Sequence, residues 1–106
     1  MKLFKFEEEV YFDKLLDMGF KVADVYWEPF EGNLTVELVR EDDSSWEEVY
    51  LHLLPQKGFY EDKVIFVTEG VLYRQHSFID EDTYRLLSEN HFSTVEEFMN
   101  HLNVNV

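Results

Sequence analysis

The chain has 106 residues, with 9 basic and 23 acidic side chains, a formal net charge of −14 and no cysteine. This length predicts a single domain over residues 1–106, and 45% hydrophobic with 17% aromatic residues excludes a disordered acidic tail. The absence of cysteine excludes disulfides, thiolate zinc sites and cysteine nucleophiles. The strong negative charge argues against direct binding of nucleic acid, because phosphate contacts require a positive surface.

The N-terminal part of the sequence predicts a helix over residues 7–18. Tyr11, Leu15 and Met18 have the spacing of one apolar helical stripe, and glutamates in the first turn oppose the helix dipole. Gly19 follows the last apolar residue and suits the left-handed conformation that ends many helices.

The middle of the chain is rich in β-branched and aromatic residues that alternate with polar ones, which predicts strands. The predicted strands cover residues 21–28, 34–40, 46–54, 64–68 and 71–76, and a helix is the alternative for 46–54. The predicted inward positions are Ala23, Val25, Trp27, Leu34, Val36, Leu38, Val49, Leu51 and Leu53. The short connections favour an antiparallel meander, since parallel crossovers need about a dozen residues.

Two helices are predicted at the C-terminal end. Asp80 can cap a helix over residues 81–90, on which Tyr84, Leu86 and Leu87 are the apolar residues. The second helix follows a capping-box pattern, formed by Ser93 with Glu96 or by Thr94 with Glu97. Its apolar residues, spaced for one helical face, are Val95, Phe98, Met99 and Leu102.

This order of elements predicts an α+β fold. We expect an N-terminal helix, a four- to five-stranded antiparallel meander sheet, and two C-terminal helices packed on one face.

No catalytic or metal-binding motif is present. The four histidines, His52, His76, His91 and His101, lack the spacing of a helical zinc pair. No serine lies in a Gly-x-Ser-x-Gly elbow, and the four glycines form no phosphate-binding loop. We therefore expect no enzymatic activity, no metal and no cofactor.

The placement of charge is more informative. From Asp24 to Glu48 there are nine acidic residues and one basic residue, Arg40, which gives this segment a net charge of −8. Acids two residues apart on a strand are about 6.5–7 Å apart, comparable to neighbouring phosphates of one nucleic-acid strand. If Glu37 and Glu48 pair across strands, like charges lie opposite one another. The candidate partner-binding residues are Asp24, Tyr26, Glu28, Glu37, Glu41, Asp42, Asp43, Glu48 and Tyr50.

We interpret this acidic surface as a binding site for a basic protein, such as a nuclease, which the chain inhibits as a nucleic-acid mimic. One alternative is a solvated sheet surface without a partner. Another is a self-associating adaptor, because residues 64–67 and 71–73 are apolar at both strand parities and would expose an aromatic sheet face. The chain is expected to be a monomer or homodimer that contacts neither membrane nor nucleic acid.

In size, charge and lack of cysteine, the chain resembles phage-encoded inhibitors of bacterial defence nucleases and the immunity proteins of nuclease toxins. This resemblance is one of composition, without a shared motif, so it implies no functional residues. Residues 1–6 contain no apolar segment of signal-peptide length, and no stretch is long and apolar enough to span a membrane. We therefore expect a cytoplasmic protein.

Overall fold

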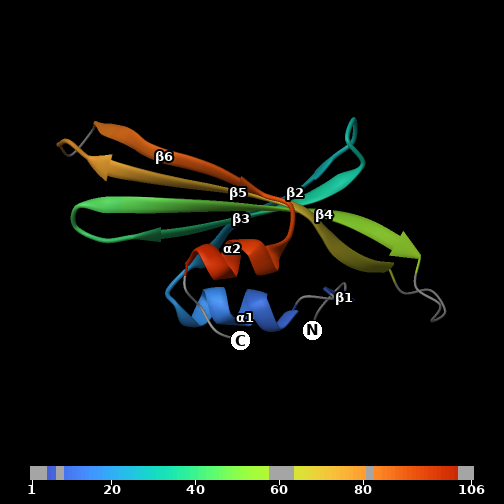
Figure 1. Cartoon of the computed structure of the whole chain (residues 1–106). Helices are drawn as coiled ribbons and strands as arrows, with labels where there is room; N and C mark the ends of the chain where they lie inside the picture. Colours follow the sequence, from blue (N-terminus) through green and yellow to red (C-terminus); the bar gives the residue numbers. More distant parts are fainter. Residues whose placement is uncertain (1–4, 7–8, 58–63, 81–82, 103–106) are drawn as a thin grey trace.

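The computed structural model describes residues 5–6, 9–57, 64–80 and 83–102, which form an α+β fold (Figure 1). The elements in chain order are β1 (Lys5–Phe6), α1 (Glu9–Asp17), β2 (Lys21–Glu28), β3 (Asn33–Glu41), β4 (Ser45–Lys57), β5 (Val64–Phe78), β6 (Tyr84–Phe92) and α2 (Val95–His101).

Strands β2 to β6 form an antiparallel sheet in which each strand pairs with the next in sequence. The predicted antiparallel meander is therefore confirmed. The two-residue strand β1, which was not predicted, pairs in parallel with β5 at Ile65 and Phe66. Within the described residues, β2 lies at one edge of the sheet and β6 at the other along most of β5.

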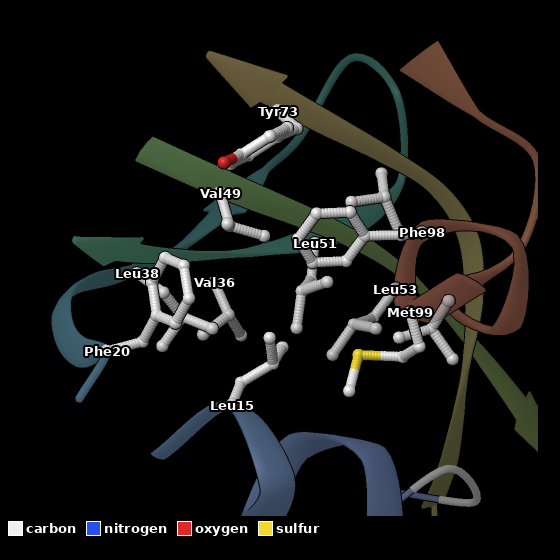
Figure 2. Close-up of a cluster of buried hydrophobic side chains, with 12 residues drawn as sticks. Leu15, Phe20, Val36, Leu38, Val49, Leu51, Leu53, Tyr73, Phe98 and Met99 are labelled. Atoms are coloured by element: carbon white, nitrogen blue, oxygen red, sulfur yellow. The ribbon is translucent and has the colours of Figure 1, made fainter. Parts of the chain in front are cut away.

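The hydrophobic core lies between the strands and the two helices (Figure 2). Its strand residues come from alternating positions, as expected for one side of a sheet. They are Val36, Leu38, Val49, Leu51, Leu53, Val71 and Tyr73. Leu15 of α1, Phe20 and the α2 residues Val95, Phe98 and Met99 complete the core. The inward positions predicted for β3 and β4 are confirmed, with Leu34 only partly buried.

Both terminal helices form where the sequence predicts them, although residues 7–8 of the first prediction lie outside the described residues. Gly19 ends α1 with a φ of 98°, the left-handed conformation that glycine adopts without strain. At α2, Thr94 is the N-cap, and its side chain accepts a hydrogen bond from the Glu97 backbone N–H at 3.1 Å. The Glu97 carboxylate in turn accepts from the Ser93 N–H at 3.2 Å, so Thr94 and Glu97 form the cap.

The prediction of a helix over residues 81–90 is wrong, because Tyr84–Phe92 forms strand β6. The Thr83 carbonyl accepts backbone hydrogen bonds from Ile79 and Asp80, which makes a turn into an antiparallel partner of β5. Pairing with the long β5 edge therefore overrides the weak helical spacing of the apolar residues in this segment. Among the described residues after β5, the one helix is α2.

Strands β4 and β5 also differ from the prediction in their extent. Residues 64–68 and 71–76, predicted as two strands, form one strand, β5. Between them, at Glu69 and Gly70, there is only a register shift opposite His52 and Leu53. Strand β4 continues past Pro55 to Lys57. Proline is tolerated there because the pairing of β4 with β3 ends at Leu53, so Pro55 needs no backbone donor on that side.

Strand β2 contains a bulge at Ala23. Val22 pairs with Leu38 and Asp24 with Glu37, so Ala23 has no partner in the register. The residues of β2 on the same side of the sheet as the core are therefore Val22, Val25 and Trp27, and not the predicted Ala23, Val25 and Trp27. All three side chains are exposed, so the prediction that this side of β2 is buried is wrong. No helix within the described residues is long and apolar enough to cross a membrane.

Candidate partner-binding surface

The sheet has a polar face, which we define as the side opposite the buried residues Val36, Leu38, Val49 and Leu51. Strand alternation and the register place six of the nine predicted site residues on this face: they are Asp24, Tyr26, Glu28, Glu37, Glu48 and Tyr50. Asp24 lies beside Glu37, which lies beside Tyr50, so three strands contribute to one row.

At the β2–β3 side of the polar face, Asp24, Glu28 and Glu37 surround Tyr26. We call these three carboxylates the acidic cluster. Burial raises the pKa of the Tyr26 hydroxyl, and the negative charges of Glu28, Glu37 and Asp24 raise it further. Within the part of the chain that the structure describes, no ion pair joins any of the three to a cation. Their charge is therefore available to a partner.

Two polar side chains of β3, Thr35 and Asn33, lie beside the acidic cluster on the polar face. The buried Thr35 hydroxyl donates to Glu28 Oε1 at 3.2 Å and lies 3.2 Å from His52 Nδ1. The Asn33 side-chain oxygen is buried and has no hydrogen-bond partner among the described residues. Such an acceptor without a donor is uncommon in folded proteins and leaves this end of the face short of donors.

Towards the centre of the sheet, Glu48 belongs to a buried hydrogen-bonded cluster. His76 Nε2 lies 2.6 Å from Glu48 Oε1, and the Tyr50 hydroxyl donates to Glu48 Oε2 while lying 3.4 Å from Glu37 Oε1. Burial and the hydrogen bond to Glu48 both raise the pKa of Tyr50. Glu37 lies opposite Tyr50 and Glu48 opposite Val39, so Glu37 and Glu48 do not pair directly across the two strands.

Aromatic rings enclose the histidine of this cluster. The Trp46 ring lies 4.6 Å from that of His76, and the Tyr84 ring stands perpendicular to His76 at 5.3 Å. His76 Nδ1 and Trp46 Nε1 are buried without a partner among the described residues. The sequence does not predict the contact of His76 with Glu48, because this contact depends on a strand register that joins residues 28 positions apart.

The remaining predicted residues, Glu41, Asp42 and Asp43, lie at the β3–β4 turn. This turn is at the opposite end of β3 from Asn33, about 26 Å away for an extended strand of this length (Figure 1). The Asp42 carboxylate accepts from the backbone N–H groups of Ser44 and Ser45 at 2.8 and 2.9 Å. These bonds lower the pKa of Asp42 and stabilise the turn. The structure therefore brings Asp24, Tyr26, Glu28, Glu37, Glu48 and Tyr50 together on one face. The turn lies beyond them, since Glu41 is four residues from Glu37 along β3, a distance of about 13 Å.

No group of three or more histidine, aspartate or glutamate side chains within the described ranges could hold a metal ion. Comparisons of the chain with protein-family models, with curated proteins and with solved structures found no match.

Proposed function

We propose that this protein binds a basic, nucleic-acid-handling protein through its polar face and inhibits it stoichiometrically, without catalysis. The observation that supports the proposal is the acidic cluster of Asp24, Glu28 and Glu37. These carboxylates lie around Tyr26, where their charges raise its pKa, and they have no cationic partner among the described residues. We propose a cytoplasmic location for this activity.

The charge of the cluster would act in two ways. A net charge of −14 steers a positively charged partner during diffusional encounter and raises the association rate. After encounter, carboxylates accept charge-assisted hydrogen bonds from the arginine and lysine side chains that otherwise hold phosphates. Exposed Tyr26, which lies among these acids, adds rigid contact area of a kind enriched at interfaces.

The acids are more widely spaced than neighbouring phosphates of one nucleic-acid strand. Asp24 and Glu28 are four residues apart on one strand, about 13 Å or twice the phosphate-like spacing, with Tyr26 between them, and Glu37 lies opposite Asp24 on the neighbouring strand. Carboxylates on a sheet are held in place by the strands, so a partner meets an ordered row of negative charge. This arrangement is consistent with an inhibitor of the anti-defence or immunity-protein kind.

The test is a capture experiment with a matched pair of charge-reversal variants. The tagged protein is incubated with nuclease-treated host lysate and eluted with a salt gradient, and eluted proteins are identified by mass spectrometry. The polar-face variant carries D24K, E28K and E37K. The control variant carries D13K, D17K and E96K, which reverse three exposed acids on α1 and α2 and change the net charge equally.

We expect a basic nucleic-acid-binding protein to bind the wild type and the control variant, to elute at moderate salt, and to be lost with the polar-face variant. Duplex DNA should compete with this capture. Equal loss with both variants would show that only total charge matters, and full retention by the polar-face variant would contradict the proposal.

A specific observation favours one second candidate, a self-associating adaptor. At the β6 edge, the exposed large apolar side chains are Ile79, Tyr84, Leu86 and Leu87. Clustered exposed apolar residues at a sheet edge mark interaction surfaces. This candidate predicts a dimer that light scattering detects at high protein concentration and that salt does not dissociate. The double variant L86K/L87K should be a monomer. A monomer at all concentrations would exclude it.

A further inference from the structure

Strand β2 is an edge strand, and none of the described residues pairs with its outer side. An edge strand presents backbone N–H and C=O groups to which another strand can add. In antiparallel sheets, alternate residues direct these groups towards and away from the partner strand. The Val25 N–H donates to Oδ1 of Asp24 at 2.9 Å and so does not point to β3. By the alternation, the backbone N–H and C=O groups of Val25 and Trp27 point away from β3, towards the outer side of the edge.

The two faces of β2 differ in chemistry. Beyond the bulge at Ala23, the register is regular from Asp24 to Glu28. Asp24, Tyr26 and Glu28 lie on the polar face, whereas Val25 and Trp27 lie on the other side and are 46% and 50% exposed. The edge therefore offers an acidic row on one face and an uncovered apolar row on the other.

We propose that residues 24–28 of β2 accept an extended segment of the basic partner as an added strand. The segment would alternate basic and apolar residues, with its lysine or arginine side chains beside Asp24 and Glu28 and its apolar side chains beside Val25 and Trp27. Main-chain hydrogen bonds supply affinity in this mode of recognition, and the alternating side chains supply specificity. This inference rests on the proposed function and specifies how the partner is held.

Charge disfavours a second copy of this chain as the added strand. Antiparallel pairing of two copies keeps the polar faces of both on the same side of the combined sheet, so the two acidic clusters would repel. A pairing centred on Tyr26 would place Asp24 of each copy opposite Glu28 of the other, and like charges in that position are destabilising. A basic segment reverses the sign of this interaction.

The test uses three capped seven-residue peptides and the full chain. The first peptide alternates lysine and valine, the second has the same composition with four lysines followed by three valines, and the third is the alternating peptide with N-methylated amides that cannot donate. Binding is followed by NMR chemical-shift changes of the protein backbone. We expect the alternating peptide to bind at least tenfold more tightly than the other two, with the largest changes over residues 21–28.

A protein variant tests the edge directly. V25P removes the outward Val25 N–H, which donates to Asp24 Oδ1 in the free protein and would pair with the added strand instead, at a position where an edge strand tolerates proline. This variant should bind the alternating peptide no better than the block peptide. If V25P fails to fold, the N-methylated peptide still decides the question.

Equal binding of all three peptides, no binding, or shift changes centred away from β2 would overturn strand addition. The capture experiment with the polar-face variant would then still decide the proposed function, since it needs only charge recognition. If the polar-face variant captured the basic protein as well as the wild type does, the proposed function itself would be overturned.

Discussion

The two sides of the polar face use their acids differently. Towards β5 and β6, two acids have a basic side chain as a hydrogen-bond partner: Glu48 lies 2.6 Å from His76, and Glu89 lies 3.0 Å from Arg74. Towards β2, Asp24, Glu28 and Glu37 have no such neighbour among the described residues. The comparison separates acids whose charge is used within the fold from acids whose charge remains available for binding.

The largest expected effect comes from breaking the buried pair. Glu48→Ala leaves the Tyr50 hydroxyl without its acceptor and His76 Nε2 without its partner in a buried site. We expect a loss of about 3–5 kcal/mol in the free energy of unfolding, because each buried polar group left unpaired costs about 1–3 kcal/mol. Urea denaturation measures it. Glu89→Ala serves as the control and should cost much less, because the Arg74–Glu89 pair is exposed. Similar losses in both variants would contradict the distinction between buried and exposed pairs.

A smaller effect is expected at Tyr73, whose hydroxyl donates to Glu47 Oε2 at 2.7 Å. Tyr73→Phe should lower the free energy of unfolding by about 1.5–3 kcal/mol, since the acceptor is charged. Burial and the bond to Glu47 raise the pKa of Tyr73. Its contribution is thus complete below the unfolded value of about 10 and is lost as pH rises through the raised folded value.

Urea denaturation of wild type and Tyr73→Phe at pH 8 and pH 11 tests this pH dependence. The difference between the two proteins should shrink at the higher pH as the wild type loses the tyrosine contribution. An unchanged difference would show that the hydrogen bond of Tyr73 does not couple to its ionisation.

At the β3–β4 turn, Asp42→Ala should destabilise the protein less than Tyr73→Phe, because this carboxylate is exposed. The lowered pKa of Asp42 means that its contribution is present above the ordinary aspartate value of about 4 and is lost as pH falls through the lowered folded value. Thermal melts at pH 7 and pH 2 measure this. A variant that differs equally from the wild type at both pH values would contradict the role of the carboxylate.

The smallest effect on stability is expected from the acidic cluster. Asp24→Asn with Glu37→Gln should change the free energy of unfolding by no more than about 0.5 kcal/mol, or increase it by relieving repulsion between cross-strand neighbours. Urea denaturation at low salt is the measurement. A clear loss would mean that these acids are structural after all.

The sequence predicts those parts of the molecule that depend on local patterns. The cap of α2 at Thr94, the end of α1 at Gly19 and the alternation of β3 and β4 are local features, and the structure contains all three. The polar positions Asp24, Tyr26 and Glu28 follow from the same period of two, although the bulge at Ala23 changes which apolar residues lie on the other side.

Features that depend on pairing between distant strands could not be predicted. Strand β6 contains Leu86 and Leu87 side by side, which suits a helix as well as a bulged strand, and only the free edge of β5 decides between them. The burial of Glu48 likewise depends on His76 of β5, so the sequence alone could not separate this acid from Glu37.

The most direct test of this separation is the rate of association with the captured basic partner, measured by stopped flow at increasing salt. We expect the wild type and the D13K/D17K/E96K control to associate quickly at low salt and to slow steeply as salt rises. The D24K/E28K/E37K variant should associate at least tenfold more slowly at low salt, with little dependence on salt. If that variant keeps the wild-type rate and salt dependence, the acidic cluster is not the binding surface.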